Sequence, residues 1–144
     1  MGETGAPPVF LVVEDEAPNR ALLRAVLGRS TDQRVRDAVL LEAPDLLTAR
    51  RVLAEAPVTL LLLDVRLPDG NGLTLARELH ERPPGRRPKV LVLSASVLPS
   101  ERDAALRAGA DAFLGKPYRP SDLIDAIRAL LDAPAPGDER RRDA

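Results

Sequence analysis

The sequence predicts an α/β fold, a doubly wound parallel sheet of five strands with five helices on both faces. Two observations support this prediction. Short apolar runs alternate along the chain with longer amphipathic stretches, and the runs are continuous, as is typical of strands buried on both faces of a parallel sheet. A repeated β-α pattern requires right-handed crossovers, which place helices on both sides of the sheet.

The expected strands are the continuous apolar runs. The first is VFLVV at Val9–Val13, and the clearest later ones are TLLLL at Thr59–Leu63 and VLVL at Val90–Leu93. Weaker runs at Ala38–Leu41 and Ala112–Leu114 complete the five. The polar connection between residues 28 and 38 is longer than most loops and is the least regular part of the pattern.

The helices are expected between these runs. Apolar residues at three- and four-residue spacing form one face in each of two stretches, namely Leu22, Leu23, Val26 and Leu27, and Leu123, Ile124, Ile127, Leu130 and Leu131. Pro18 fits the first turn of the earlier helix. Asn71, Ser100 and Ser121 are predicted N-caps of the helices that follow them.

The bulk composition fits one domain. We assign it to residues 9–132 of the 144 and expect flexible tails or a linker at 1–8 and 133–144, since Pro134, Pro136 and Gly137 end the last helix and a charged run follows. The absence of cysteine excludes a disulfide framework and thiolate metal sites and fits a reducing cytoplasm. The net charge is −1 and no apolar run approaches the ~20 residues that cross a bilayer. We therefore expect a cytoplasmic protein without direct nucleic-acid or membrane binding.

Chemically compatible side chains follow four of the five predicted strands. Glu14 and Asp15 follow the first run, Asp64 the third, Ser94 the fourth and Lys116 the fifth. Functional groups gather at the carboxyl ends of strands in open parallel sheets, so we expect these side chains to share one pocket. Taken alone, each of these residues is more simply explained as a turn former, a helix cap or a surface group. The prediction depends on their joint pattern.

The chemistry of this cluster favours phosphoryl transfer. Crowded carboxylates repel one another, and a hard divalent cation such as Mg²⁺ relieves the repulsion and can bridge to a phosphate. Lys116 adds a positive charge, and Ser94 adds a hydroxyl donor for phosphoryl oxygens. A carboxylate nucleophile such as Asp64 would then form an acyl phosphate.

These residues stand in stretches that resemble the receiver domain of bacterial response regulators. The stretches are VVEDE from Val12, LLLDVRLPDGNGL from Leu61, LSAS from Leu93 and AGADAFLGKPY from Ala108, followed by the last amphipathic helix. They occur in the expected order across residues 9–132. The resemblance implies a flavodoxin-like strand order, 2-1-3-4-5, in the predicted sheet.

The resemblance also implies a phosphoacceptor and a metal site. Asp64 corresponds to the phosphoacceptor. Asp15 would bind Mg²⁺ directly and Glu14 through water, with Asp64 and the backbone carbonyl of Arg66 completing the site. The acid pair is Glu-Asp here, where Asp-Asp is commoner, so the metal geometry is expected to shift slightly.

The remaining implied roles concern the response to phosphorylation. Ser94 corresponds to the switch hydroxyl that moves toward the phosphoryl group, and Lys116 to the lysine beside it. The bond before Pro117 is a candidate cis peptide. Phe113 falls at the aromatic switch position, where Tyr is usual. It lacks a hydroxyl, so switching would depend on packing alone.

By resemblance, the chain is a phosphorylation-dependent switch and not a turnover enzyme. It would take a phosphoryl group from a histidine kinase or a phosphotransfer protein and change its binding of a downstream protein. The face of the fourth helix, fifth strand and fifth helix would bind that partner or form a homodimer. The alternatives are a receiver module of a hybrid histidine kinase and a degenerate receiver that acts only in docking or dimerisation. A phosphatase of the haloacid dehalogenase type needs a second acid two positions after the nucleophile, where this chain has Arg66.

Three other features receive plain interpretations. His80, late in a predicted helix, is expected at the surface. Arg140-Arg141-Arg142 is flanked by acids and reads as a solvated tail. Asp69-Gly70-Asn71-Gly72 lacks the spacing of a calcium-binding EF-hand loop and reads as a turn that leads into a helix.

Overall fold

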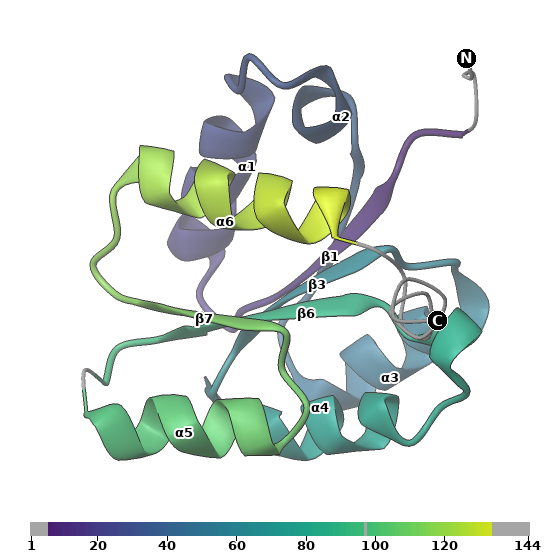
Figure 1. Cartoon of the computed structure of the whole chain (residues 1–144), viewed down its shortest axis with the longest axis vertical. Coiled ribbons are helices and arrows are strands. Elements are labelled where there is room, and N and C mark those ends of the chain that lie inside the picture. The colour runs from purple at the N-terminus through teal and green to yellow at the C-terminus, as the bar shows by residue number, and fades with distance from the viewer. Residues whose placement is uncertain (1–5, 97, 134–144) are drawn as a thin grey trace, which may run out of the picture.

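A computed structural model describes residues 6–96 and 98–133 of the chain. Its centre is a five-stranded parallel sheet in the order β2-β1-β3-β6-β7, which confirms the predicted order 2-1-3-4-5 (Figure 1). The strands are β1 (Val9–Val13), β2 (Val39–Ala43), β3 (Leu60–Asp64), β6 (Lys89–Ser94) and β7 (Ala112–Gly115). β1 has its predicted bounds. β2 begins and ends later than predicted, because its register pairs Val9 with Val39 and Val13 with Ala43.

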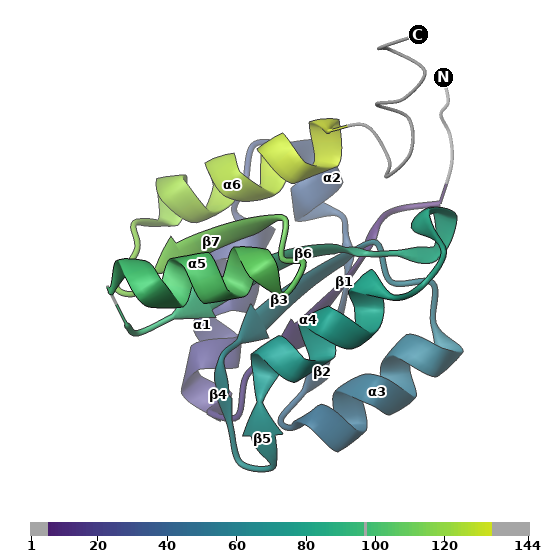
Figure 2. The same cartoon turned by 60° about the horizontal axis from the view of Figure 1, so that its bottom comes forward.

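Helices cover both faces of the sheet, as Figures 1 and 2 show. One layer holds α1 (Ala17–Gly28), α2 (Gln33–Arg36) and α6 (Pro120–Asp132), and the other holds α3 (Leu46–Glu55), α4 (Gly72–His80) and α5 (Pro99–Arg107). The side chains of each strand alternate between two buried clusters, so that Leu61 and Leu63 pack on the α3–α5 side and Leu60 and Leu62 on the α1–α6 side. The continuous apolar runs exist because both faces of each strand are buried.

The described residues form six α-helices, one more than predicted, and the additional helix is α2. It lies in the polar connection between residues 28 and 38. The Asp32 carboxylate caps it by accepting from the Arg34 N–H at 2.9 Å, and Val35 is its buried anchor. A helix of four residues is too short to show a helical period in the sequence.

Two of the three predicted N-caps are wrong. Asn71 does cap α4, with its side chain accepting from the Leu73 N–H at 2.8 Å. Ser100 and Ser121 instead lie inside α5 and α6, which begin at Pro99 and Pro120. Proline is favoured in the first helical turn because its missing N–H has no partner there, and Pro18 in α1 follows the same rule, as predicted.

Short elements connect the main ones. β4 (Arg66–Leu67) and β5 (Gly70–Asn71) form an antiparallel ribbon after β3, and a 3₁₀ turn, η1 (Pro84–Arg86), precedes β6. Among the described helices, none has the length and apolar character needed to span a bilayer. Of the predicted tails at 1–8 and 133–144, the described residues include only 6–8 and 133, and the arginine run lies outside them.

Candidate functional site

Three carboxylates meet at the carboxyl end of the sheet. Glu14 and Asp15 directly follow β1, and Asp64 is the last residue of the neighbouring strand β3. One oxygen from each of the three lies within 4.8 Å of the other two. β1 is the strand at which the sheet order reverses, so the cluster lies where open α/β sheets place their ligands. The structure thus brings together the three acids that the sequence selected.

Lys116 supplies the positive charge of this cluster. It follows β7, where its backbone N–H donates to the Ser94 carbonyl at 2.6 Å. Its Nζ lies 3.2 Å from Glu14 Oε1 and 3.7 Å from Asp64 Oδ2. The ammonium therefore contacts two of the three acids. The peptide bond between Lys116 and Pro117 is cis, as predicted.

Glu14, which is buried, and Asp64, which is partly buried, have opposite pKa shifts. Burial raises the pKa of Asp64, and the repulsion from Glu14 adds to this effect, while Lys116 and two backbone N–H groups oppose it. Burial also acts on Glu14, but the backbone N–H of Glu16 and the charge of Lys116 outweigh it and lower the pKa of Glu14. Of these two acids, Asp64 has the less compensated charge, so a hard cation coordinated by these carboxylates fits the donor set.

Ser94 lies beside the cluster at the end of β6, with its side chain almost fully buried. Its Oγ accepts from the Ser96 N–H at 3.1 Å and donates to Glu101 Oε1 at 3.5 Å. The second contact is at the outer limit of a hydrogen bond. Glu101 lies in the first turn of α5 and no sequence pattern indicated its contact with Ser94.

Phe113 is a central residue of β7, opposite Val92 of β6. It is half-buried and packs against the cluster beneath α3, α4 and α5. Its position between the sheet and these helices is compatible with the predicted packing role, which stays a prediction.

Gly72 is a residue of the site that the sequence did not single out. A Cβ placed on it would lie 2.1 Å from the backbone carbonyl oxygen of Asp64. Its N–H donates to the Val65 carbonyl at 2.7 Å. Only glycine lets the start of α4 approach the end of β3 this closely, and the approach fixes the backbone that carries Asp64.

The structure also shows where Asp69, Arg66 and His80 lie. Asp69 accepts from the N–H groups of Leu46 and Leu47 at 2.8 and 3.0 Å, so it caps α3 across the sheet edge and is not part of a calcium loop. Arg66 lies exposed in β4, two residues after Asp64, and the proposed metal contact of its backbone carbonyl stays a prediction. His80 is exposed, as predicted.

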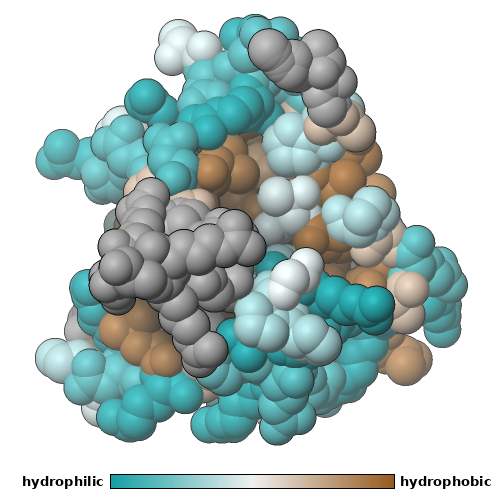
Figure 3. Space-filling model, turned by 45° about the vertical axis from the view of Figure 1, so that its right-hand side comes forward, coloured by the Kyte–Doolittle hydropathy of each residue, from teal (hydrophilic) through white to brown (hydrophobic). Residues whose placement is uncertain are grey.

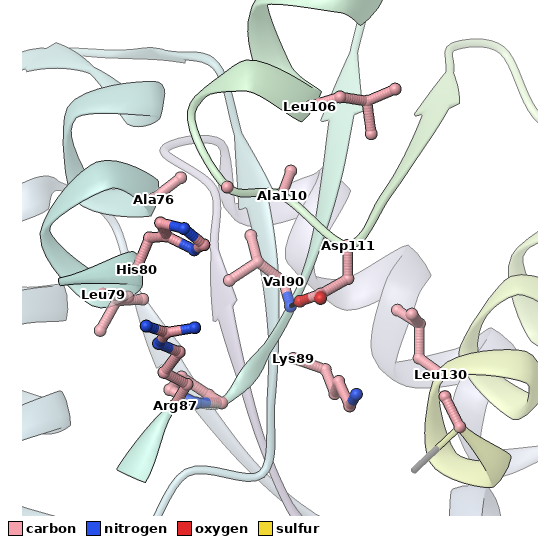
Figure 4. Close-up of a pocket in the computed structure, with 13 residues that line it drawn as sticks. Ala76, Leu79, His80, Arg87, Lys89, Val90, Leu106, Ala110, Asp111 and Leu130 are labelled. Atoms are coloured by element: carbon pink, nitrogen blue, oxygen red, sulfur yellow. Dashed lines mark hydrogen bonds between the residues drawn. The ribbon is translucent and has the colours of Figure 1, made fainter. Parts of the chain in front are cut away.

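A cavity of about 430 Å³ lies at the opposite, amino-terminal edge of the strands (Figure 4). His80, Arg87, Leu106 and Leu130 line it, and Asp111 at its centre accepts from the Val90 N–H at 2.8 Å. That edge also exposes hydrophobic surface between hydrophilic outer parts of the molecule (Figure 3). The cavity holds none of the residues selected from the sequence as a catalytic or metal site.

Comparison with known proteins agrees with this geometry. The family model of the response regulator receiver domain matches residues 10–128. Protein PetR of Rhodobacter capsulatus is 35% identical over 129 residues, 89% of this chain and 50% of that protein. The phosphate regulon transcriptional regulatory protein PhoB of Escherichia coli is 35% identical over 122 residues, 85% of this chain and 51% of that protein. The chain thus spans about half the length of these relatives.

Solved structures agree as well. A response regulator structure from Chloroflexus aurantiacus has a TM-score of 0.78 and 26% identity, and the match covers 89% of this chain and all of that one. The receiver domain of sensor histidine kinase PA1611 from Pseudomonas aeruginosa has a TM-score of 0.74 and 26% identity over the same shares. Its structure has a magnesium ion coordinated in the active site cleft. The strand order and the acidic cluster of this structure agree with the family model that matches residues 10–128. This chain therefore belongs to the response regulator receiver domain family of two-component systems.

Proposed function

We propose that this receiver domain accepts a phosphoryl group on Asp64 and that phosphorylation changes its binding of a partner protein. The observation that carries the proposal is the convergence of Glu14, Asp15 and Asp64 within 4.8 Å, with the Lys116 ammonium 3.7 Å from Asp64. Among the three acids, Glu14 is buried, Asp15 is exposed and Asp64 is partly buried. A buried carboxylate beside fixed charges is suited to act as a nucleophile toward phosphorus.

In the proposed reaction an Asp64 oxygen attacks the phosphorus of a phosphohistidine. The new P–O bond gives an acyl phosphate as the P–N bond breaks, and the bonding electron pair returns to the imidazole nitrogen. Lys116 and the Ser94 hydroxyl stabilise negative charge on the phosphoryl oxygens. The phosphoryl group is carried on the domain's own Asp64, so the domain acts on itself. It catalyses its own phosphorylation and dephosphorylation and is not a turnover enzyme.

Mg²⁺ fits the donor set of this site. Asp15 and Asp64 would bind it directly, Glu14 through water, and the backbone carbonyl of Arg66 would add a neutral oxygen. When bound, the ion neutralises charge on the carboxylates and on the incoming phosphoryl group. The solved relative with a coordinated magnesium ion supports this assignment.

The phosphoryl donor is proposed to be a histidine kinase or a phosphotransfer protein. The change in partner binding is proposed to begin at Ser94. Its hydroxyl donates to only one acceptor at a time, so Ser94 would have to leave Glu101 to reach a phosphoryl oxygen. Glu101 belongs to α5, and Phe113 lies on the adjacent strand β7. The α5–β7–α6 face is therefore where a change of partner binding or homodimerisation is expected.

Exposure to Mg²⁺ with a small acyl-phosphate donor, or with BeF₃⁻, tests the proposal. Intact mass spectrometry should show an Mg²⁺-dependent phosphoryl adduct on wild type and none on Asp64→Ala. Asp125→Ala, which removes an exposed acid on α6, is the control and should be modified like wild type. A wild type that stays unmodified, or an adduct that persists in Asp64→Ala, would contradict the proposal and favour a receiver that acts only by docking.

A further inference from the structure

Arg20 connects three elements that meet at the acidic cluster. It lies in the first turns of α1, with only 19% of its side chain exposed. Its Nη1 donates to the backbone carbonyl of Glu14 at 2.7 Å, and its Nε donates to Glu42 Oε1 at 3.0 Å. Glu42 belongs to β2, opposite Val12 of β1. One guanidinium thus joins the helix, the second strand and the loop that carries the acid pair.

The Arg20 contact completes the restraint of the Glu14 backbone. On the other side of this residue, the Glu14 N–H donates to the Ala43 carbonyl of β2 at 3.0 Å. The Glu14 side chain accepts from the Glu16 N–H at 3.0 Å, and this hydrogen bond restrains the segment 14–16. Glu14 is 4% exposed, so water cannot readily replace a lost partner of its carbonyl.

The peptide unit held by Arg20 sets the direction of Asp15. The Glu14 carbonyl and the Asp15 N–H belong to the same planar group, so fixing the carbonyl fixes the plane from which the Asp15 side chain departs. Asp15 is itself exposed. Its side chain has no hydrogen bond or ion pair among the described residues, so the restraint on its position comes from this peptide, which Arg20 holds.

We propose that Arg20 is a positioning residue for the divalent-cation site, acting through the Glu14–Asp15 peptide. This inference rests on the proposed function, because it needs the three carboxylates to bind the cation. The competing role of Arg20 is electrostatic, a positive charge near the acids that weakens cation binding. The two roles predict effects of opposite sign when Arg20 is removed. Glu42 pairs with Arg20 and offsets part of its charge, which favours the positioning role.

Arg24 offers a matched control. It lies one turn further along α1 and also pairs with Glu42, but it is 61% exposed and has no hydrogen bond to the Glu14 carbonyl among the described residues. Arg24→Ala therefore removes the same charge, from the same helix and the same partner, without freeing the loop.

The experiment measures Mg²⁺ and Mn²⁺ affinity by calorimetry, with the Mn²⁺ electron paramagnetic resonance spectrum as a second readout of ligand geometry. Arg20→Ala should weaken Mg²⁺ binding about tenfold, the usual effect of removing a group that orients a metal ligand, and should change the Mn²⁺ spectrum. Arg20→Lys should recover part of the affinity, because one ammonium can reach only one of the two acceptors in the guanidinium geometry. Arg24→Ala should stay within about twofold of wild type.

Each outcome separates this inference from the proposed function. Unchanged or tighter Mg²⁺ binding in Arg20→Ala would overturn the positioning role while leaving the receiver function intact. An equal loss in Arg24→Ala would also overturn it, because charge alone would then explain the effect. If Arg20→Ala does not fold, Arg20→Lys decides alone: it keeps the charge but cannot make both contacts of the guanidinium, so weaker Mg²⁺ binding supports the inference and unchanged binding counts against it. A wild type that binds no Mg²⁺ would instead refute the proposed function.

Discussion

Replacing Asp64 with asparagine is expected to stabilise the fold when no divalent cation is bound. The pKa of Asp64 is raised by burial and by the neighbouring Glu14. A carboxylate whose folded pKa lies above its unfolded value destabilises the fold at pH 7, and this cost disappears as the pH falls below the unfolded pKa. Asparagine has nearly the same shape and carries no charge, so it removes the cost at neutral pH.

The size of the effect follows from the charges around Asp64. At an effective dielectric constant near 20, repulsion from Glu14 at the 4.8 Å limit is about 3.5 kcal/mol. Attraction to Lys116 at 3.7 Å is about 4.5 kcal/mol. Because 4.8 Å is the largest separation of these oxygens, about 3.5 kcal/mol is the smallest repulsion between them, so the net attraction is at most about 1 kcal/mol and burial of the carboxylate outweighs it. Lys116 keeps its contact with Glu14 in the variant, so we expect a gain of about 1 kcal/mol.

Urea unfolding followed by circular dichroism measures this difference, once with a chelator and once with Mg²⁺. In the chelator, Asp64→Asn should be the more stable protein. At a twentyfold excess over its dissociation constant, Mg²⁺ should stabilise wild type by about 1.8 kcal/mol and the variant by much less, which reverses the order. Asp125→Asn should show neither effect. A less stable Asp64→Asn in the chelator, or equal stabilisation of both proteins by Mg²⁺, would refute the reasoning.

Three further predictions concern the scaffold. Gly72→Ala should destabilise the fold by about 3 kcal/mol in thermal unfolding, because its Cβ would lie 2.1 Å from the Asp64 carbonyl, whereas Gly28→Ala has open space and should be neutral or slightly stabilising. The Arg34 guanidinium lowers the pKa of Asp32 to about 2, so its stabilisation is present above the unfolded pKa near 3.8 and is lost as the pH falls toward 2. After allowance for solvent screening, Asp32→Asn, which keeps the cap, should cost about 1 kcal/mol at pH 7 in pH-dependent urea unfolding, and this cost should shrink as the pH falls below 3.8 and vanish only below the folded pKa of about 2. Leu62→Ala should cost about 3 kcal/mol because the residue is fully buried, and the exposed Leu22→Ala should cost less than about 0.5 kcal/mol in the same assay.

The sheet could be predicted from the sequence because burial on both faces leaves a continuous apolar run. The run at β3 is the clearest case: Leu60 to Leu63 are all fully buried, on alternating sides. The register between strands then decided the bounds of β2, and no local pattern contains that information. The short helix α2 was also missed, because it depends only on its cap Asp32 and its buried Val35 and no helical period shows in four residues.

The candidate site divides in a similar way. The chemically distinctive residues could be selected because each follows a strand, and parallel strands bring their ends together. The supporting residues could not, because their roles exist only in three dimensions. Gly72 matters through a backbone eight positions earlier in the chain, Arg20 through a strand 22 positions away, and Glu101 through a hydroxyl at the end of β6.

Lys116 links Glu14 to Asp64, the proposed phosphoacceptor, and this double contact bears on the proposed switch. Its ammonium contacts both Glu14 and Asp64, whereas a resemblance at the level of motifs assigns it only to phosphoryl oxygens. A phosphoryl group on Asp64 would offer it more concentrated negative charge and would compete with Glu14 for the ammonium. Because the Lys116 backbone N–H is bound to the Ser94 carbonyl, a shift of Lys116 would act directly on the strand end that carries the switch hydroxyl. Glu14, Asp64 and the ends of β6 and β7 are therefore connected through a single residue, Lys116.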